Sequence, residues 1–491
     1  MSNLSELLPS GGGQNQVEFV ASGTLPNGQA VILNSDGTIT AAGMVPTSIP
    51  EAIPSGSQYD FNPGQSAYPP SVSFDPNTAG KFVVAYPDYS NSNYGTAVIG
   101  TVSGTTLSFG AEYVYNSASS ASASVAFDPN TAGKFVVTYG YSAANAVVGT
   151  VSGTSISFGS ATTFNSNTSM LSRGISFDPN TAGKFVVVYQ DASNSGYGTA
   201  IAGTISGTSV SFGSEYVYST TNTNFNTVAF DPNTAGKFVV TFIDMTGGAN
   251  YGKARVGTVS GTTISYGSVA TFNSADTRDI SMSFDPSTSG NLVVAYRDYS
   301  STYGEAIIGA VSGTSITFGS QYVFISSAID WTAVAFDPST ANKFIVESTG
   351  STVLLATVGT VSGTTISYGT ANTLYTSSPS SPTVAFEPNG DGRFVTCYNR
   401  YAGRAILGQM TATVQATNLT STNLIGISAE AASSGATAKI NTWGGINEAQ
   451  SSLTIASDYY VQTDGTITTA TGGQKVGQAI SATTINMRNQ P

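Results

Sequence analysis

Short apolar runs follow one another along the middle of the chain, separated by turns rich in Gly, Asn, Asp and Pro. In the first complete set, residues 71–74 (SVSF) alternate apolar and polar positions, and residues 81–86 (KFVVAY) are β-branched and aromatic. Residues 96–102 (TAVIGTV) and 105–109 (TTLSF) flank a Ser-Gly pair, and residues 111–115 (AEYVY) extend the last run. Runs of this length, bounded by turn residues, are typical of strands, so the set predicts four β-strands.

This set of strands is one copy of an internal repeat. The segment FDPNTAGKFVV begins unchanged at Phe74, Phe127, Phe177 and Phe230, and related segments begin at Phe284, Phe336 and Phe386. Successive copies lie 50 to 54 residues apart, which gives seven copies of a unit of about 52 residues. Its turn has a physical basis, because Asp can cap it, Pro presets φ, and the residue before Lys needs a positive φ. That residue is Gly in six copies and Asn342 in one, and Asn tolerates the left-handed conformation best among side chains.

Four-stranded units of this length predict an all-β fold, a seven-bladed β-propeller. Immunoglobulin-like domains need roughly 100 residues per copy and β-helix coils far fewer, so both fit worse. Most copies end in an outer strand with Gly five residues before an aromatic residue, yet the seventh copy does not reach one. A matching segment, Gly56 to Phe61 (GSQYDF), precedes the first copy. We expect this N-terminal strand to complete the last blade and close the ring, which leaves no open sheet edge.

The ends of the chain do not match the repeat. Residues 17–47 and 417–491 each contain a predicted hairpin with an Asp-Gly turn, at Asp36 and Asp464. We expect the two ends to fold together into one small β-barrel or sandwich, into which the propeller of residues 48–416 is inserted. Residues 1–16 are interpreted as a flexible anchoring arm, and a disordered terminus is the alternative.

Composition narrows the chemistry. Only 9% of the residues are charged, 16 basic against 28 acidic, and the chain has no His and a single Cys, Cys397. So few cations on an acidic chain argue against nucleic acid as a partner. The lack of His removes the commonest general base and zinc ligand, and one Cys forms no internal disulfide. No apolar run is long enough for membrane insertion, and residues 1–16 lack the features of a secretory signal, which predicts synthesis in the cytoplasm.

The terminal segments also resemble a known family. LLPSGGGQ and VEFVASGTLPNGQAVILNSDGTIT near the start, with NLIGISAEAASSGATAKI, LTIASDYYVQTDGTITT and VGQAISATTI near the end, resemble the split terminal module of structural proteins in tailed bacteriophages, particularly marine ones. The repeat segment YGTAVIGTVSGTTLSFG is similar to propeller repeats in such appendage proteins. The resemblance implies a virion component that is assembled in the host cytoplasm, and it transfers no catalytic residues.

Candidate binding residues belong to the loops that vary between copies. In a propeller the DPNTAG and SGT turns share one face, whereas the loops after the second strands and before the first strands share the other. Aspartates and tyrosines that recur at equivalent loop positions suit turn capping and packing better than binding. The candidates for ligand binding are Arg278, Arg297, Asp330, Trp331, Arg400 and Tyr401.

Catalysis and metal binding have weaker support in the sequence. No motif arranges the arginines, a tyrosine and carboxylates as a sialidase needs, and paired carboxylates of another glycosidase stay an alternative. The loop NSADTRD brings Asp276 and Asp279 together, which suits calcium less well than solvation. We therefore predict no enzyme activity, no cofactor and no metal site.

These observations predict a phage virion protein, a tail or head fibre or a capsid decoration, whose propeller attaches to a host surface or glycan. Its expected partners are other virion proteins and a host glycan, and a homo-oligomer stays open. One alternative is a purely architectural spacer or cement protein, and another is a cellular, lectin-like propeller.

Overall fold

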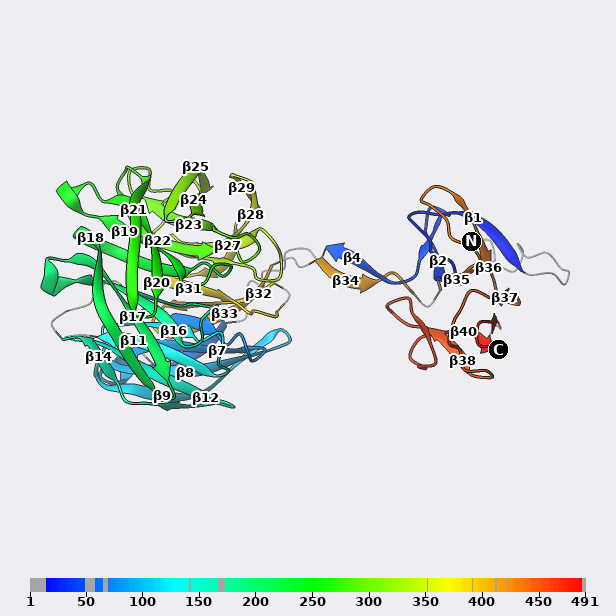
Figure 1. Ribbon diagram of the computed structural model, residues 1–491, viewed down its shortest axis with the longest axis horizontal. Coiled ribbons are helices and arrows are strands. Elements are labelled where there is room, and N and C mark those ends of the chain that lie inside the picture. Colours follow the sequence, from blue (N-terminus) through cyan, green and yellow to red (C-terminus); the bar gives the residue numbers. More distant parts are fainter. Residues whose placement is uncertain are drawn as a thin grey trace. The chain divides into compact units, whose positions relative to one another are not determined.

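The computed structural model describes residues 15–48, 58–64, 69–140, 143–166, 173–350, 352–390, 392–410, 413–420 and 422–487. Within these ranges the regular structure is β-strand, apart from the single 3-10 turns η2 (Tyr89–Asn91), η3 (Ala192–Asn194) and η4 (Thr246–Gly248). By internal contacts the chain divides into a terminal unit, Met1–Ile49 with Thr413–Pro491, and a repeat unit, Pro50–Ala412 (Figure 1). The predicted all-β class is confirmed, and no described helix has the length and apolarity of a membrane span.

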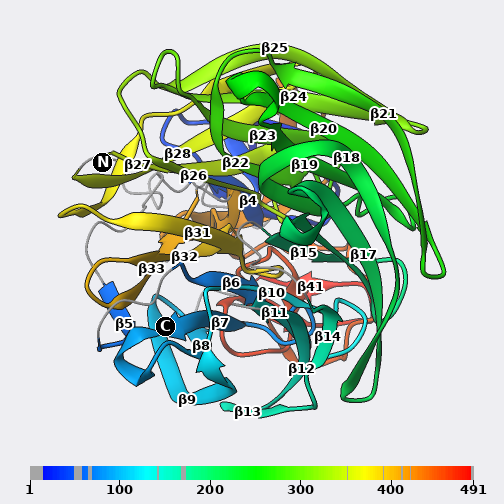
Figure 2. The same cartoon turned by 90° about the vertical axis from the view of Figure 1, so that its left-hand side faces the viewer.

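The repeat unit consists of antiparallel sheets in which strands consecutive in sequence pair with one another. The sheets are β6 (Ser71–Phe74), β7 (Lys81–Asp88), β8 (Tyr94–Ser103) and β9 (Thr106–Ser119); β10 (Ser122–Phe127), β11 (Lys134–Gly140), β12 (Ala144–Ser152) and β13 (Ser155–Phe158), with β14 (Thr162–Asn165) also on β12; β15 (Arg173–Phe177), β16 (Lys184–Asp191), β17 (Tyr197–Ser206), β18 (Ser209–Phe230), β19 (Lys237–Asp244), β20 (Tyr251–Ser260) and β21 (Thr263–Asn273); β22 (Thr277–Phe284), β23 (Asn291–Asp298), β24 (Gly304–Ser312) and β25 (Ser315–Ile325); β26 (Trp331–Phe336), β27 (Lys343–Thr349), β28 (Val353–Ser362) and β29 (Thr365–Tyr368), with β30 (Asn372–Thr376) also on β28; and β31 (Ser380–Phe386), β32 (Arg393–Asn399), β33 (Gly403–Gln409) and β5 (Gln58–Asn62). Figure 2 shows the sheets arranged around a common centre, with the first strand of each sheet nearest to it.

The last of these sheets contains a strand from the beginning of the chain. β5 pairs antiparallel with β33, with Asn62 opposite Gly403 and Gln58 opposite Ile406. Phe61 is buried in a core that joins residues of the first and last sheets, among them Phe82 and Leu407. The predicted pairing of an N-terminal strand with the last sheet is therefore confirmed.

The repeated FDPNTAG turn joins neighbouring sheets as well as its own two strands. Asp75 accepts a hydrogen bond from Asn77 N at 2.9 Å through Oδ1 and another from Gly133 N of the next sheet at 3.0 Å through Oδ2. Asn77 Nδ2 donates to Pro129 O of that next turn at 3.1 Å. Positive φ angles of 62° to 79° occur at Gly80, Gly133, Gly183, Gly236, Gly290, Asn342 and Gly392, as the sequence predicts. The turn therefore fixes both the hairpin and its neighbour, which explains why it varies so little.

Two glycines of the third strands make room for aromatic rings. A Cβ at Gly203 would lie 2.2 Å from the Phe185 ring, and one at Gly198 would lie 2.3 Å from the Tyr218 ring. The same glycine-to-ring contact occurs at Gly100, Gly149, Gly257, Gly359 and Gly408 with the phenylalanine of the second strand. These rings fill the space between sheets, so the apolar core is divided among the sheet-to-sheet interfaces rather than gathered in one centre.

The terminal unit contains strands from both ends of the chain. Its sheets are β1 (Gln16–Val20), β36 (Thr437–Asn441), β35 (Leu424–Ser428), β2 (Ala30–Leu33) and β3 (Ile39–Ala41); β37 (Ile446–Asn447), β41 (Ile485–Asn486), β40 (Gln474–Ala479), β38 (Asp458–Val461) and β39 (Ile467–Thr468); and the ribbon β4 (Met44–Ser48) with β34 (Thr413–Thr417). Both Asp-Gly hairpins are present, with φ of 84° at Gly37 and 82° at Gly465.

The predicted anchoring arm lies mostly outside the described residues. Residues 15 and 16 are described, and Gln16 begins β1 with Asn15 directly before it. Gln16 pairs with Asn441 in the register of β1 with β36, and Asn15 Nδ2 donates to Trp443 O at 2.9 Å. The sheet therefore begins earlier than the boundary at residue 17 that the sequence pattern suggests.

Candidate ligand-binding site on the loop face

The repeat unit has two faces with different roles. The turns between first and second strands lie on one face, beside the ends of the third strands, since Val102 N donates to Gly80 O at 2.8 Å. The described part of the last sheet also ends on this face, because Met410, just after β33, donates through its N to Gly392 O of the last such turn. The opposite face, here called the loop face, carries the loops that differ between copies.

The four recurrent aspartates of the loop face cap their own turns. Each accepts a hydrogen bond at 2.8 to 3.0 Å from the backbone N–H two residues later. The residues are Asp88, Asp191, Asp244 and Asp298. The structural role predicted for these aspartates is confirmed.

Two predicted arginines share one aromatic ring. Arg278 on β22 lies opposite Arg297 on β23 in the sheet register. The Arg278 guanidinium carbon is 4.1 Å from the centre of the Tyr299 ring, and that of Arg297 is 4.8 Å from it. Tyr299 therefore serves as a support for two cations and is not a free platform for a sugar.

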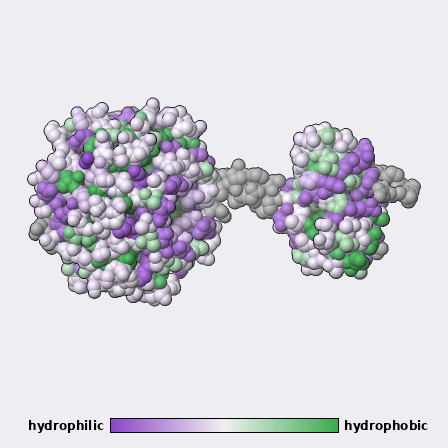
Figure 3. Space-filling view, in the orientation of Figure 1, coloured by the Kyte–Doolittle hydropathy of each residue, from purple (hydrophilic) through white to green (hydrophobic). Residues whose placement is uncertain are grey.

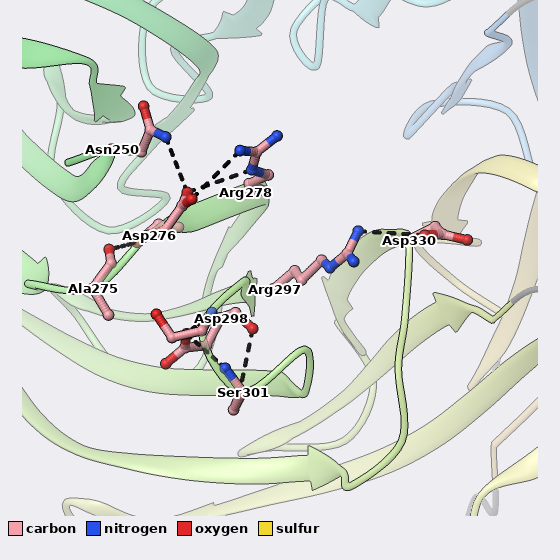
Figure 4. A network of polar contacts seen from close by, with 10 residues as sticks. Asn250, Ala275, Asp276, Arg278, Arg297, Asp298, Ser301 and Asp330 are labelled. Carbon is pink, nitrogen blue, oxygen red and sulfur yellow. Dashed lines mark hydrogen bonds and ion pairs between the residues drawn. The ribbon is translucent and has the colours of Figure 1, made fainter. Parts of the chain in front are cut away.

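Both arginines are also ion-paired, and the pairs extend the group to neighbouring loops (Figure 4). Arg278 Nε lies 3.4 Å from Asp276 Oδ1, and Arg297 Nη1 lies 3.3 Å from Asp330 Oδ1 on the loop before β26. Asn250 Nδ2 donates to the same Asp276 oxygen at 3.1 Å. We call Asp276, Arg278, Asp279, Arg297, Tyr299 and Asp330 the arginine cluster.

Asp279 is the buried member of the cluster. It has a φ of 54° at an irregularity in the pairing of β22 with β23, and it is only 8% exposed. Burial raises the pKa of Asp279 to about 7, while the nearby Arg297 opposes the shift. The Thr332 hydroxyl donates to the backbone oxygen of Asp279, which ties this position to β26. The expectation that Asp279 is solvated is therefore wrong, because the irregularity turns its side chain inward.

A small apolar pocket adjoins the cluster. Its volume is about 70 Å³. Its wall consists of Asn224, Phe225, Ile243, Met245, Asn250, Thr277 and Arg278. Sequence reasoning did not select the first five of these residues. Phe225 lies five residues before Phe230 of its repeat, and Asp279 lies five residues before Phe284 of the next. An alignment of the copies would therefore have shown that the residue at this position changes from copy to copy.

The other three predicted residues lie elsewhere or contribute differently. Trp331 begins β26, opposite Thr349, and is half-buried beside Asp330. Arg400 and Tyr401 occupy the turn between β32 and β33, where the guanidinium lies 4.0 Å from the ring centre. Tyr401 is 73% exposed, the most exposed large apolar side chain among the described residues. The structure thus joins Arg278, Arg297 and Asp330 in one group and places Arg400 with Tyr401 on another loop.

The chemistry of the cluster favours binding. Its accessible groups are guanidinium and amide donors beside an apolar hollow, which is the composition of a recognition site. Among the described residues no group of three His, Cys, Asp or Glu side chains is placed to hold a metal ion. Over the visible face of the repeat unit the surface is largely pale, near-neutral residues with scattered hydrophilic and small apolar patches (Figure 3).

Comparisons with known proteins address the fold. No protein-family model matches the chain, and no curated protein matches it in sequence. The BP39L lectin from Burkholderia pseudomallei is similar in structure, with 12% identity, a TM-score of 0.52, and coverage of 71% of this chain and 99% of the lectin. The Cps50 (Swd1) β-propeller domain of Myceliophteria thermophila has 10% identity and a TM-score of 0.50, over 72% and 100% of the two chains. At such low identity the likeness concerns the fold alone, and that fold is a β-propeller.

Proposed function

We propose that this chain is a virion structural protein of a tailed bacteriophage, in which a seven-bladed propeller presents a glycan-binding loop face. The observation that carries the proposal is the arginine cluster with its apolar pocket on the loop face. The protein would be made in the host cytoplasm and act as part of the virion.

Seven blades are supported by the contacts of the inner strands. These strands touch in the closed order β6, β10, β15, β18, β22, β26, β31 and again β6. Each is followed by one FDP or FEP turn, and β18 serves two sheets because it continues from an outer strand into an inner one. The single ring in this proposal matches the seven repeats of the sequence.

The virion assignment depends on the terminal segments. Their motifs resemble the split terminal module of phage structural proteins, and in this chain the two ends build joint sheets. We propose that the terminal unit is the mount that contacts other virion proteins. This proposal does not specify how many copies of the chain a virion contains.

Binding is proposed rather than catalysis. Glycoside hydrolysis generally uses two carboxyl groups that flank the scissile bond, one as acid and one as base or nucleophile. In the cluster, Asp276 and Asp330 are each ion-paired with an arginine, and Asp279 is buried beneath them. This leaves donors for hydroxyl and carboxylate groups without a matched acid and base.

A glycan array with the purified full chain tests the binding role. We expect wild-type protein to retain a defined set of glycans, and Trp331→Ala and Arg297→Gln to reduce that binding. Binding to no glycan would favour the architectural spacer. Mass spectrometry and antibody-labelled electron microscopy of phage particles test the location, since a protein absent from particles would favour the cellular lectin-like propeller.

A further inference from the structure

The carboxylate of Asp276 is held by side-chain donors of Asn250 and Arg278. Its Oδ1 accepts from Asn250 Nδ2 at 3.1 Å and from Arg278 Nε at 3.4 Å, and its Oδ2 accepts from Arg278 Nη2 at 3.4 Å. Charge-assisted bonds of this type are normally about 2.7 to 2.9 Å long. The Arg278 side chain is 41% exposed and that of Asp276 is 28% exposed. The chain's own carboxylate is therefore loosely held on donors that solvent can reach.

The same two donors form part of the apolar pocket. Arg278 and Asn250 line it together with the apolar side chains of Phe225, Ile243 and Met245, and Asn224 and Thr277 complete its wall. A volume of about 70 Å³ exceeds that of one water-sized probe several times and suits a group of two or three heavy atoms. Apolar walls disfavour ordered water and favour a methyl group. A ligand that used both features would carry an anion and a short apolar group on one small unit.

We propose that this site binds an acidic sugar that carries an N-acyl group, and the proposal rests on the glycan-binding function above. The sugar carboxylate replaces that of Asp276 on Arg278 and Asn250, and the acyl methyl enters the pocket beside Met245. Because Arg278 and Asn250 belong to both features, carboxylate and acyl group must lie on the same monosaccharide. Arg297 stays paired with Asp330 and keeps Tyr299 in place beneath Arg278.

Local charge is needed for such a ligand because the whole chain repels it. The net charge is −12, so an anion gains nothing from the general field of the protein. Two of the sixteen basic residues meet at Tyr299, and the loss of the Asp276 contact frees one of them at little cost, since solvent-accessible ion pairs contribute little to stability. Selectivity for an acidic sugar therefore comes from replacement of the Asp276 carboxylate by the carboxylate of the ligand.

Calorimetric titration of the full chain tests this proposal with four probes. N-acetylneuraminic acid has both groups, glucuronic acid only the carboxylate, N-acetylglucosamine only the acyl group, and N-acetylalanine has both groups without a sugar ring. We expect N-acetylneuraminic acid to bind at least tenfold more tightly than the other three.

Three variants locate the site. Asp276→Asn is expected to raise the affinity for N-acetylneuraminic acid roughly two- to fivefold, as removal of an exposed competing ion pair predicts. Arg278→Gln should lower it about tenfold or more, with partial rescue in Arg278→Lys. Met245→Trp fills the pocket and should weaken N-acetylneuraminic acid while leaving glucuronic acid unchanged. Val323→Trp, on the exposed outer strand β25, is the control and should change neither.

The outcomes separate this inference from the broader proposal. If the chain binds neutral glycans and not the acidic N-acyl sugar, the inference is overturned and the glycan-binding function stands. If no glycan binds in the array, both fall. Equal or tighter binding of N-acetylalanine would overturn the inference in favour of a peptide ligand, and an unchanged affinity in Asp276→Asn and Arg278→Gln would place the sugar elsewhere. Circular dichroism of each variant excludes misfolding as the cause of lost binding.

Discussion

Asp178 lies in the turn before β16 and Asp191 lies at the end of that strand, and both cap turns, yet only Asp178 also joins two successive repeats. Its Oδ1 accepts from Asn180 N at 3.0 Å and its Oδ2 from Gly236 N in the turn of the next repeat at 2.9 Å. Asp191 accepts through Oδ1 from the backbone and hydroxyl of Ser193 in its own turn. The carboxylate of Asp178 thus accepts from two backbone donors, one in its own turn and one in the turn of the next repeat.

We expect Asp178→Asn to lower the free energy of unfolding by about 2 kcal/mol, because in either orientation the amide nitrogen would face a buried N–H donor. Asp191→Asn keeps an oxygen for the cap and should cost about 0.5 kcal/mol or less. Urea denaturation followed by tryptophan fluorescence measures both. Equal losses in the two variants would show that the hydrogen bond from Gly236 N contributes nothing beyond the turn cap.

Glu347 on β27 is a fully buried carboxyl group at the contact with the next sheet. The Thr396 hydroxyl donates to its Oε1, and burial raises the pKa of Glu347 to about 8 from an ordinary 4.5. In the unfolded chain the group ionises above pH 4.5, whereas in the folded protein it stays neutral up to about pH 8. The contribution of Glu347 to stability is therefore fully present below pH 4.5. The free energy of unfolding then falls as the pH rises from 4.5 to about 8.

The Glu347→Gln variant should lose this dependence. Relative to wild type, its free energy of unfolding should rise by up to about 1.4 kcal/mol per pH unit between pH 4.5 and 8, and the difference should be constant above that range. Denaturation curves at pH 5, 6.5 and 8 test it. Parallel pH profiles of variant and wild type would mean that Glu347 is ionised in the folded state.

Residue roles were predictable from the sequence where they are local. The Asp cap and the positive φ at Asn342 follow from turn chemistry within a few residues. The second acceptor of Asp75, for Gly133 N of the following copy, depends on how sheets pack and has no signal in a single repeat. The burial of Asp279 was not predictable for the same reason. The irregularity in the pairing of β22 with β23 decides which way its side chain points.

At the scale of elements, the third strands contain glycines that leave room for buried aromatic rings. Gly203 lies opposite Phe185 in the register of β16 with β17, and a Cβ there would be 2.2 Å from the ring. Gly207, in the turn after β17, has a φ of 62° and open space around it. One glycine is needed for packing and the other for backbone conformation.

We expect Gly203→Ala to destabilise the protein by about 1 to 3 kcal/mol, because the added methyl must displace a buried ring. Gly207→Asn should cost about 1 kcal/mol or less, since Asn accepts the left-handed conformation and meets no neighbour. Thermal unfolding of the two variants distinguishes the roles. A larger loss in Gly207→Asn than in Gly203→Ala would contradict this division.

Strand positions followed from the apolar pattern, but their extent did not. Each predicted run has its strand, because period-two alternation and β-branched residues suit a pleated, half-buried surface. β18 instead continues over 22 residues, Ser209–Phe230, from the outer edge of one sheet into the inner strand of the next. The sequence between the two predicted strands is rich in Thr and Asn, so composition there indicates a loop although the backbone stays paired.

At the scale of the whole molecule, the repeat predicted the ring and the loop face, and only part of the site. Arg278, Arg297 and Asp330 were selected because they do not recur, and they do meet. The pocket beside them was not predictable, because Phe225 and Met245 come from the neighbouring sheet and only the closed arrangement brings them to Arg278.

Closure of the ring depends on β5, and Phe61 is its buried anchor. The Phe61 ring lies 5.2 Å from that of Tyr86 and 5.9 Å from that of Phe109, both in the first sheet. Phe164 makes the equivalent contacts inside the chain, 5.6 Å from Tyr189 and 4.9 Å from Phe212. The two positions differ in that β5 is a strand from the start of the repeat unit that pairs with its last sheet.

We expect Phe61→Ala and Phe164→Ala each to lower the free energy of unfolding by about 3 to 5 kcal/mol, since both remove a packed ring. Only Phe61→Ala should also open the ring locally, because without its anchor β5 is held by a few backbone bonds to β33. Hydrogen exchange of residues 403–409 should therefore accelerate in Phe61→Ala under native conditions and stay slow in Phe164→Ala. Protection of β33 that is the same in both variants would show that closure does not depend on this side chain, and that the contacts of β31 with β6 hold the first and last sheets together by themselves.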